Sequence, residues 1–191
     1  MTIEKITAQQ LDILLPFAKK TFFDTYAHLS APADFNAYSD AAFNGDKLLS
    51  ELNNPNSSFY FAMMDNSPAG YLKVNYSDAQ KEFQDQNTME LERLYVLSQY
   101  HNKQIGKQLL QFAIQAAHNK KLQYIWLCVW GENLTAISFY ERNGFKISGT
   151  HTFPFGDEKD GDLIMKASNS AESWNHAYHE LKTRDSGEII I

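Results

Sequence analysis

The residues that are best suited by type and position to bind a ligand lie in a polar turn that leads from an extended segment into a helix. Residues 91–106 combine a run of Leu, Tyr and Val with a short polar loop, after which apolar residues recur at helical spacing. Such a helix start gathers unpaired backbone N–H groups at the positive end of the helix dipole, which favours a phosphate-bearing ligand. Lys103 and Lys107 flank the turn. An ordinary strand-to-helix connection has the same pattern, so the turn predicts an anion site without identifying its ligand.

Two carboxylates precede the turn on the extended segment. Strand alternation predicts one face made of Glu90, Glu92, Leu94 and Val96. It predicts an opposite face made of Leu91, Arg93 and Tyr95. Carboxylates on a strand are commonly solvated or paired with a neighbouring cation, for which Arg93 is available.

A second strand and a short helix must complete this unit. Residues 124–130 form an apolar run typical of a buried strand. Asn133 is suited to cap a helix that carries Ala136, Ile137, Phe139 and Tyr140. Asn143 and Gly144 follow, and these residue types end helices in a left-handed turn.

The order VLSQYHNKQIGKQLL, then WLCVWGENLTAISFYERNGF, resembles the GCN5-related N-acetyltransferase (GNAT) superfamily. The pieces GYLKVNYSDAQ, ELERLYV and GTHTFPFGDEKDGDLIM resemble its PaiA-type spermidine/spermine N-acetyltransferases. This resemblance runs from about the first helix to Lys166. It implies a mixed α+β fold, with a central, mostly antiparallel sheet that is splayed at the acetyl-CoA site and flanked by helices. It also implies acetyl transfer from acetyl-CoA to a primary amine, with spermidine or spermine as the favoured acceptor.

The same resemblance implies a cofactor site. The main chain of Leu94, Tyr95 and Val96 would pair with the pantetheine arm, and Asn133 and Arg142 would contact the pantetheine amides and a phosphate. The pyrophosphate loop would comprise His101, Asn102, Lys103, Gln104, Ile105, Gly106 and Lys107. His101 stands where the superfamily usually has Arg or Gln, and Gln104 stands where it has Gly. A side chain at position 104 is expected to crowd a backbone that approaches phosphate closely.

Catalytic roles follow from the resemblance as well. A polyamine nitrogen is protonated near neutral pH and must lose a proton before it attacks. Glu90 stands at the position of a catalytic glutamate in the superfamily, and Glu92 is its rival. Tyr140 stands at the general-acid position, and the Val96 N–H would polarise the thioester carbonyl. The alternatives are core packing for Leu94, Val96 and Tyr140, and a solvated helix end for Arg142.

Other side chains argue against a covalent or metal-dependent mechanism. Cys128 lies in an apolar run without an adjacent histidine, so we expect direct transfer in a ternary complex and no acyl-enzyme. The six histidines show no metal-ligand spacing, and no metal site is predicted.

Composition sets the remaining expectations. A chain of 191 residues that is 43% hydrophobic predicts one domain, residues 1–167, followed by a polar extension, residues 168–191. The formal charge of −6 favours a cationic ligand such as a polyamine over nucleic acid. No signal peptide or membrane span is evident, so we expect a cytoplasmic protein with no membrane partner. A homodimer is left open.

Three further expectations concern the substrate side. A helix over residues 8–20 should be kinked or restarted at Pro16, and the aromatic segment that follows should pack in the core or present Asp24 or Tyr26 to an amine. Residues 76–87 are predicted to be a solvated, mobile loop, and Asp157 could meet a cationic acceptor. The alternatives to a polyamine enzyme are acetylation of a protein N-terminus or another small amine, and a non-catalytic CoA-binding regulatory module.

Overall fold

The computed structural model describes residues 1–26, 39–40, 42–152 and 161–168. Asp157 and the extension from residue 169 onward lie outside the described residues. Among the described helices, none is both long and apolar enough to cross a membrane.

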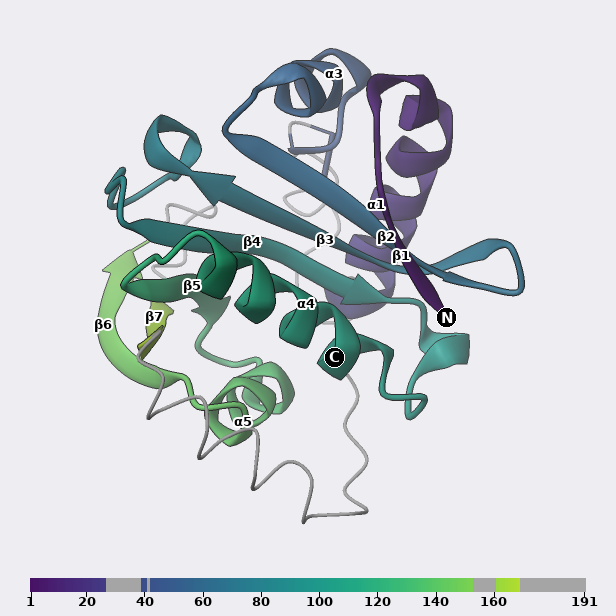
Figure 1. Ribbon diagram of the computed structural model, residues 1–191. Helices are drawn as coiled ribbons and strands as arrows, with labels where there is room; N and C mark the ends of the chain where they lie inside the picture. The colour runs from purple at the N-terminus through teal and green to yellow at the C-terminus, as the bar shows by residue number, and fades with distance from the viewer. Residues whose placement is uncertain (27–38, 41, 153–160, 169–191) are drawn as a thin grey trace.

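A seven-stranded sheet forms the centre of the molecule (Figure 1), with the strand order β1-β2-β3-β4-β5-β7-β6. All neighbouring strands are antiparallel except β4 and β5, which are parallel. The strands are β1 (Thr2–Lys5), β2 (Ser57–Met64), β3 (Ser67–Tyr76), β4 (Thr88–Val96), β5 (Tyr124–Trp130), β6 (Lys146–Thr152) and β7 (Gly161–Ser168). This is the mixed α+β architecture expected from the sequence.

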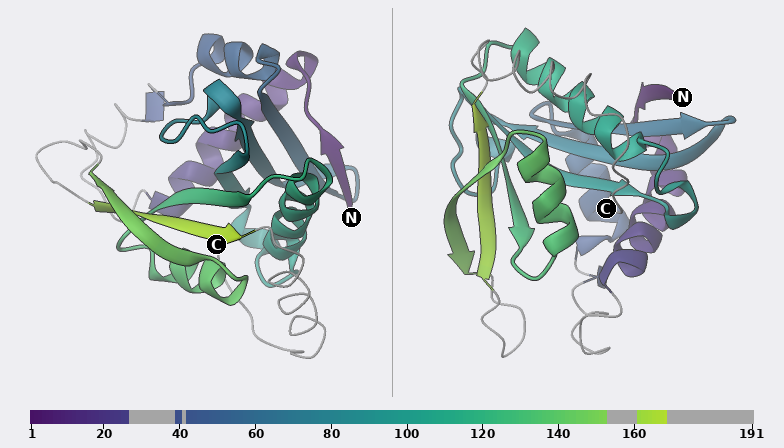
Figure 2. Two further views of the ribbon diagram at one scale, coloured as in Figure 1. Left: turned by 60° about the vertical axis from the view of Figure 1, so that its left-hand side comes forward. Right: turned by 90° about the horizontal axis from the view of Figure 1, so that it is seen from below.

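Helices cover both faces of the sheet, as two further views show (Figure 2). The α-helices are α1 (Leu11–Tyr26), α3 (Gly45–Asn53), α4 (Ile105–Asn119) and α5 (Leu134–Arg142). Short 3-10 turns occupy Ala8–Gln10, Ser77–Ala79 and Ser98–Tyr100. α4 and α5 share one apolar core with the sheet, and α1 and α3 share a second core with β2 and β3 on the opposite face.

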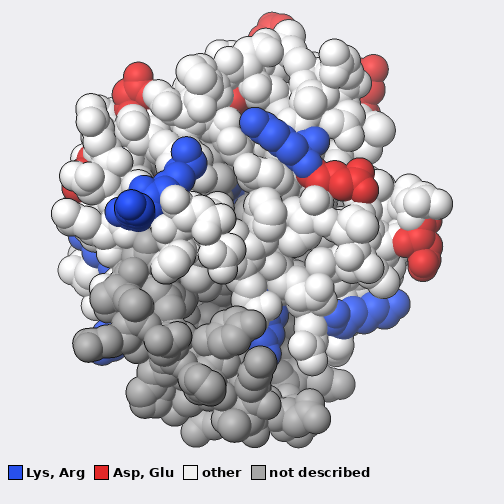
Figure 3. Space-filling view, in the orientation of Figure 1, with Lys and Arg blue, Asp and Glu red and all other residues white. Residues whose placement is uncertain are grey.

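The apolar spacing noted in the sequence accounts for α4. Leu109, Leu110, Ala113 and Ala117 are all fully buried against the sheet, while Gln108 and Gln115 on the other side are exposed. Figure 3, which has the orientation of Figure 1, shows Lys and Arg side chains on this face as separate patches, one of them directly beside acidic side chains.

β4 and β5 separate after a short stretch of pairing. Their register covers only Thr88–Tyr124, Met89–Ile125 and Glu90–Trp126. Beyond this point β5 stays paired with β7, and β4 stays paired with β3 as far as Val96. The sheet is therefore splayed between the ends of β4 and β5, as expected.

A β-bulge in β4 contradicts the predicted alternation of its side chains. Lys73 of β3 pairs with Arg93, but the next residue, Val74, pairs with Leu91, which leaves Glu92 as the extra residue. Leu91 and Leu94 consequently face the same apolar core, although they differ by three positions. The prediction that Glu90 and Glu92 share a face with Leu94 and Val96 is wrong because strict alternation fails at a bulge.

The structure rules out one alternative for α1 and refines the expected loop at residues 76–87. α1 continues through Pro16 to Tyr26 without a restart, so the aromatic segment forms the last turns of the same helix. Most of residues 76–87 are exposed, as expected of a solvated loop, but Gln80 within them is 1% exposed and makes four hydrogen bonds.

Candidate active site

The opening between β4 and β5 exposes backbone groups at the end of β4. The Leu97 N–H donates to the Ala69 carbonyl of the β3 side at 2.9 Å. In an antiparallel pair successive residues point their backbone groups to alternate sides, so Val96 turns its N–H and C=O away from β3 and toward the opening. The imidazole Nε2 of His101 lies 3.0 Å from the Val96 carbonyl oxygen, on that side of the strand. The Val96 N–H is thus available to a ligand that enters between the strands.

The N-terminus of α4 lies just beyond this opening and has no side-chain cap. Gln104 is the N-cap residue, it makes no capping hydrogen bond, and the first helical bond runs from Gln108 N–H to the Gln104 carbonyl. The N–H groups of Ile105, Gly106 and Lys107 consequently have no partner within the helix, and the helix dipole makes this end attractive to an anion. A phosphate-bearing group fits these free donors.

Gln104 adopts the backbone conformation that explains the usual glycine at this position. Its φ is 58°, in the left-handed region where a side chain is disfavoured. Asn102 also has a positive φ of 64°, which asparagine tolerates better than most residues. The expected crowding at position 104 therefore has a second component, strain in the residue's own backbone.

The other predicted cofactor residues lie at the surface of the loop and of α5. Asn102 and Lys103 are exposed, and the Lys103 ammonium lies 5.1 Å from the centre of the Tyr100 ring. Asn133 caps α5 by accepting a hydrogen bond from the Ala136 N–H at 3.1 Å, as predicted. Arg142 is exposed, and its Nε donates to the Ser138 carbonyl of its own helix at 3.0 Å. Their contacts with a cofactor stay predictions.

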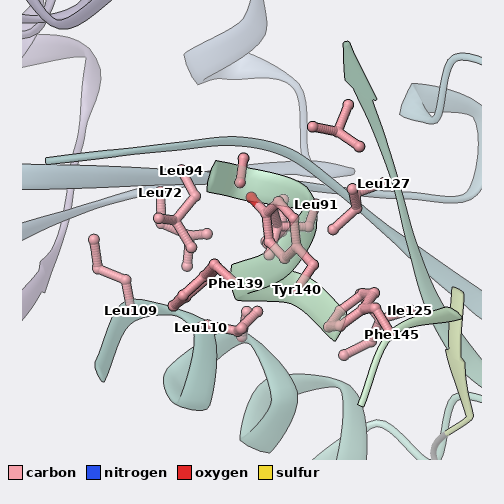
Figure 4. Packing of buried hydrophobic residues seen from close by; sticks show 14 of the residues in the cluster. Leu72, Leu91, Leu94, Leu109, Leu110, Ile125, Leu127, Phe139, Tyr140 and Phe145 are labelled. Atoms are coloured by element: carbon pink, nitrogen blue, oxygen red, sulfur yellow. The ribbon is translucent and has the colours of Figure 1, made fainter. Parts of the chain in front are cut away.

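Tyr140 projects from α5 into the core beside β4. Figure 4 shows its ring between Phe139 and Leu91, with the hydroxyl oxygen directed toward the strands and away from α4. Tyr140 is 6% exposed, and burial, with a small contribution from Tyr26, raises its pKa well above the usual range. The phenol therefore stays protonated at neutral pH and can donate a proton.

Glu90 lies on the α1 and α3 face of β4, at the last residue that pairs with β5. It is 3% exposed, and its Oε2 accepts hydrogen bonds from Asn75 Nδ2 at 2.8 Å and from the Lys81 backbone N–H at 3.2 Å. Burial and the charge of Glu92 raise the pKa of Glu90, although the hydrogen bond from Asn75 and the charge of Lys81 oppose this. A carboxyl group with a raised pKa is suited to accept a proton near neutral pH.

Glu92 is held in an ion cluster with Glu51 of α3, Lys73 of β3, Arg93 and Lys81. Its oxygens lie 3.0 Å from Lys81 Nζ and 3.2 Å from Arg93 Nη2, and Lys73 Nζ contacts both Glu92 and Glu51. Burial alone would raise the pKa of Glu92, but the charges of Arg93, Lys73 and Lys81 outweigh burial and hold the pKa well below its usual range. Glu92 thus remains ionised and ion-paired, which makes it a poor proton acceptor.

Three aromatic rings converge near the opening on the α1 side. The Tyr26 ring centre lies 6.5 Å from that of Tyr95 on β4 and 6.4 Å from that of Trp130 on β5. Tyr95 also stacks on Tyr71 at 5.7 Å. Tyr26 therefore spans the two diverging strands. Sequence reasoning proposed Tyr26 but missed Trp130, although its even spacing with Trp126 and Cys128 on β5 places it on this face.

Cys128 also lies on this face of β5, because Leu127 and Val129 belong to the opposite core. Burial raises the pKa of the Cys128 thiol to about 12, with smaller contributions from Asp162, Glu90 and Glu82. A thiol with such a pKa is a poor nucleophile at neutral pH. Within the described ranges, no group of three or more His, Cys, Asp or Glu side chains is arranged to hold a metal ion.

The model of the acetyltransferase (GNAT) family matches residues 19–145, and the chain belongs to this family. The chain is thus an acetyl-CoA-dependent N-acetyltransferase, and the splayed sheet with free donors at its opening is its candidate active site.

Two relatives extend the comparison over most of the chain. The uncharacterized N-acetyltransferase in the pepI 3′ region of Lactobacillus delbrueckii subsp. lactis is 34% identical, over 86% of this chain and 95% of that protein. The spermidine N(1)-acetyltransferase of Thermoplasma acidophilum is 29% identical, over 82% of this chain and 95% of that protein.

A solved structure agrees with these relatives. The crystal structure of PaiA N-acetyltransferase from Thermoplasma acidophilum in complex with coenzyme A has a TM-score of 0.71 and 27% identity. The alignment covers 88% of this chain and 99% of that one.

Proposed function

We propose that this enzyme acetylates a primary amine of a polyamine such as spermidine or spermine, by direct attack in a ternary complex with acetyl-CoA. The observation that carries the proposal is Glu90, a buried carboxyl group with a raised pKa at the point where β4 and β5 diverge. A protonated amine that reaches this point meets a buried carboxylate whose pKa is raised by burial and by the charge of Glu92.

The residues around the opening fit acetyl-CoA. The uncapped start of α4 offers the N–H groups of Ile105, Gly106 and Lys107 to a pyrophosphate, and the exposed Lys103 adds positive charge. The end of β4, from Leu94 to Val96, offers strand-like backbone pairing to an extended pantetheine arm. Acetyl-CoA supplies an activated acyl group as a thioester at the end of that arm.

Each catalytic residue then has one task. Glu90 accepts the proton of the attacking ammonium, directly or through a water molecule. The fixed dipole of the Val96 N–H stabilises the negative charge that develops on the carbonyl oxygen. Tyr140, kept protonated by its raised pKa, donates a proton to the departing thiolate, and the second proton that the nitrogen loses as the amide forms restores the phenol. Glu92, whose charge is neutralised in the ion cluster, takes no part in proton transfer.

The acceptor side suits an alkylammonium chain. The rings of Tyr26, Tyr95 and Trp130 provide aromatic faces beside the opening, and such faces attract both methylene groups and cations. The formal charge of −6 favours a polycation over long range. The name of the Thermoplasma acidophilum relative, a spermidine N(1)-acetyltransferase, agrees with this acceptor class.

Direct attack is favoured over an acyl-enzyme by the state of Cys128. Its thiol has a pKa of about 12, so almost no thiolate exists at neutral pH. Glu90 is therefore expected to act on the amine itself.

A thiol-release assay tests this proposal. The purified protein is incubated with acetyl-CoA and, separately, spermidine, spermine, putrescine, an aminoglycoside or a peptide with a free N-terminus. We expect release with spermidine and spermine. Release with the peptide or aminoglycoside alone would replace the polyamine by that acceptor. Acetyl-CoA binding without release from any amine would favour a CoA-binding regulatory module.

A further inference from the structure

The side chain of Gln80 makes four hydrogen bonds on the face of the sheet that carries Trp126. Its Nε2 donates to the carbonyls of Ser77 at 3.3 Å and Asp85 at 2.7 Å. Its Oε1 accepts from Thr88 Oγ1 at 2.9 Å and from the indole N–H of Trp126 at 2.7 Å. The indole can only donate, so the amide has a single orientation that satisfies all four partners.

These four bonds fix residues 77–87 against β4 and β5. Two of them close the segment on itself, and two attach it to Thr88 at the start of β4 and to Trp126 on β5. Phe83 adds an apolar contact, because its ring packs edge-on against Trp126 with centres 4.9 Å apart. Trp126 is also the residue that pairs with Glu90 across the two strands.

The residue that follows Gln80 contacts both glutamates. The Lys81 backbone N–H donates to Glu90 Oε2 at 3.2 Å, and the Lys81 Nζ lies 3.0 Å from Glu92 Oε1. Asn75 Nδ2 donates to one oxygen of each carboxylate, at 2.8 and 2.6 Å. A shift of residues 80–81 would remove the hydrogen bond from the Lys81 N–H to Glu90 and the half-exposed cation beside the two carboxylates.

We propose that Gln80 and Lys81 are positioning residues that set the protonation of Glu90. Gln80 fixes the segment, and Lys81 supplies a backbone donor to Glu90 and a positive charge beside the carboxylate pair. The inference that this matters for turnover rests on the proposed role of Glu90 as base. The effect on Glu90 itself can be measured without turnover.

The other charged and titratable groups near Glu90 come from every element packed around it. These are Glu92 and Arg93 of β4, Lys73 of β3, Glu51 of α3, and Cys128 of β5. Lys73, Arg93, Glu51 and Glu92 neutralise one another in the ion cluster. Lys81 is the member that faces solvent and also contacts Glu90, so its removal should change the pKa of Glu90 with little repacking.

The sign of the change follows from the charges. The Lys81 cation and its N–H both stabilise the ionised form of Glu90 and so lower its pKa relative to burial alone. Lys81→Met removes the cation, and Gln80→Leu releases the segment that holds both groups. Both variants should raise the pKa of Glu90, by about one pH unit, the lower end of the effect of a neighbouring charge.

The experiment measures the Glu90 carboxyl carbon by NMR in protein labelled with ¹³C-glutamate, with Glu90→Gln used to assign the signal. Wild type, Lys81→Met, Lys81→Arg and Gln80→Leu are titrated, and Lys5→Met, on the exposed β1, is the charge-matched control. We expect raised pKa values for Lys81→Met and Gln80→Leu, and wild-type values for Lys81→Arg and Lys5→Met. An unchanged pKa in Lys81→Met, which removes only a half-exposed side chain, would overturn the proposal even if Gln80→Leu fails to fold.

The pH dependence of kcat/KM for spermidine is then measured in the same variants, and the pKa of its acid limb is compared with the NMR pKa of Glu90. A limb that moves with the NMR pKa supports both the positioning role and Glu90 as the base. A raised NMR pKa with an unmoved limb supports the positioning of Glu90 and refutes its role as base, so the two proposals fail separately. Leu110→Ala in the opposite core, a destabilised variant with an intact segment 77–87, should leave both values unchanged.

Discussion

Replacing Gly70 by alanine is expected to displace the backbone that we propose polarises the thioester. Gly70 of β3 pairs with Val96, and a Cβ added to it would lie 2.7 Å from the Tyr95 carbonyl oxygen. It would also lie 3.2 Å from Val96 Cγ2 and 3.3 Å from Leu109 Cδ1. The oxygen belongs to the backbone, so no side-chain rotation relieves the contact. Ordinary contact begins at 3.4 Å, so the strands must move apart by about 0.7 Å.

Two magnitudes follow from this displacement. Overpacking of a filled core typically lowers the free energy of unfolding by about 1–3 kcal/mol, which a thermal or urea melt measures. A misplacement of about 1 Å at reacting groups can cost roughly a hundredfold in rate, so we expect Gly70→Ala to lower kcat/KM for acetyl-CoA by roughly tenfold or more. Thiol release at varied acetyl-CoA concentration measures this loss.

Gly149→Ala is the matched control. Gly149 also lies in a strand, but the nearest atom to an added Cβ is Ile164 Cδ1 at 3.9 Å, an ordinary contact. We expect wild-type kinetics for this variant. If Gly70→Ala also retained wild-type kcat/KM, the end of β4 would not be the backbone that holds the acyl group.

Three further substitutions have defined outcomes. Tyr140→Phe should lower kcat roughly tenfold or more while leaving acetyl-CoA affinity unchanged by calorimetry, and an unaltered kcat would remove Tyr140 from the mechanism. Gln104→Gly should relieve a left-handed backbone strain of about 1 kcal/mol at a φ of 58°, raise stability and tighten acetyl-CoA binding; no gain in either would refute both strain and crowding. Glu92→Gln should lower the free energy of unfolding at pH 7 by about 3–5 kcal/mol, because it leaves buried cations unpaired. The pKa of Glu92 is lower in the folded than in the unfolded protein, so the stability difference between wild type and Glu92→Gln should have its full size above about pH 4.3, the pKa of an unfolded glutamate. The difference should shrink as the pH falls below that value. A stability difference that urea melts show to be independent of pH would contradict the ionised state assigned to Glu92.

Patterns of apolar residues predicted most elements of the fold, because each element buries one regular face. The expected strand at residues 124–130 is β5, and the helix from Ile105 onward is α4. Asn143 and Gly144 end α5 as expected, with a φ of 87° at Gly144. The edge position of β1 also agrees with its exposed residues.

The bulge at Glu92 could not be derived from alternation, because one extra residue leaves the apolar pattern on either side intact. Leu91 and Leu94 both remain apolar, but they now face the same core. From the sequence alone, Glu90 and Glu92 were equally good candidates for the base. In the structure, the cations of the ion cluster lower the pKa of Glu92, whereas the pKa of Glu90 is raised. That cluster depends on Lys73 and Glu51, which lie far from β4 in the sequence.

Gln80 was missed for a related reason. A glutamine in a polar segment is usually solvated, and only the tertiary fold brings Trp126 within hydrogen-bonding distance of it. The glutamine at position 104, by contrast, could be recognised from the sequence as a special residue. It stands where the superfamily usually has glycine, and a glycine in such a loop often indicates a positive φ.

The most direct test of the central claim is mass spectrometry of both reactants after a single turnover with acetyl-CoA and spermidine. We expect spermidine to gain the mass of one acetyl group while the protein mass stays unchanged, and Glu90→Gln to slow this gain strongly at pH 7. Spermidine of unchanged mass, or a protein that carries the acetyl group, would contradict direct transfer to a polyamine.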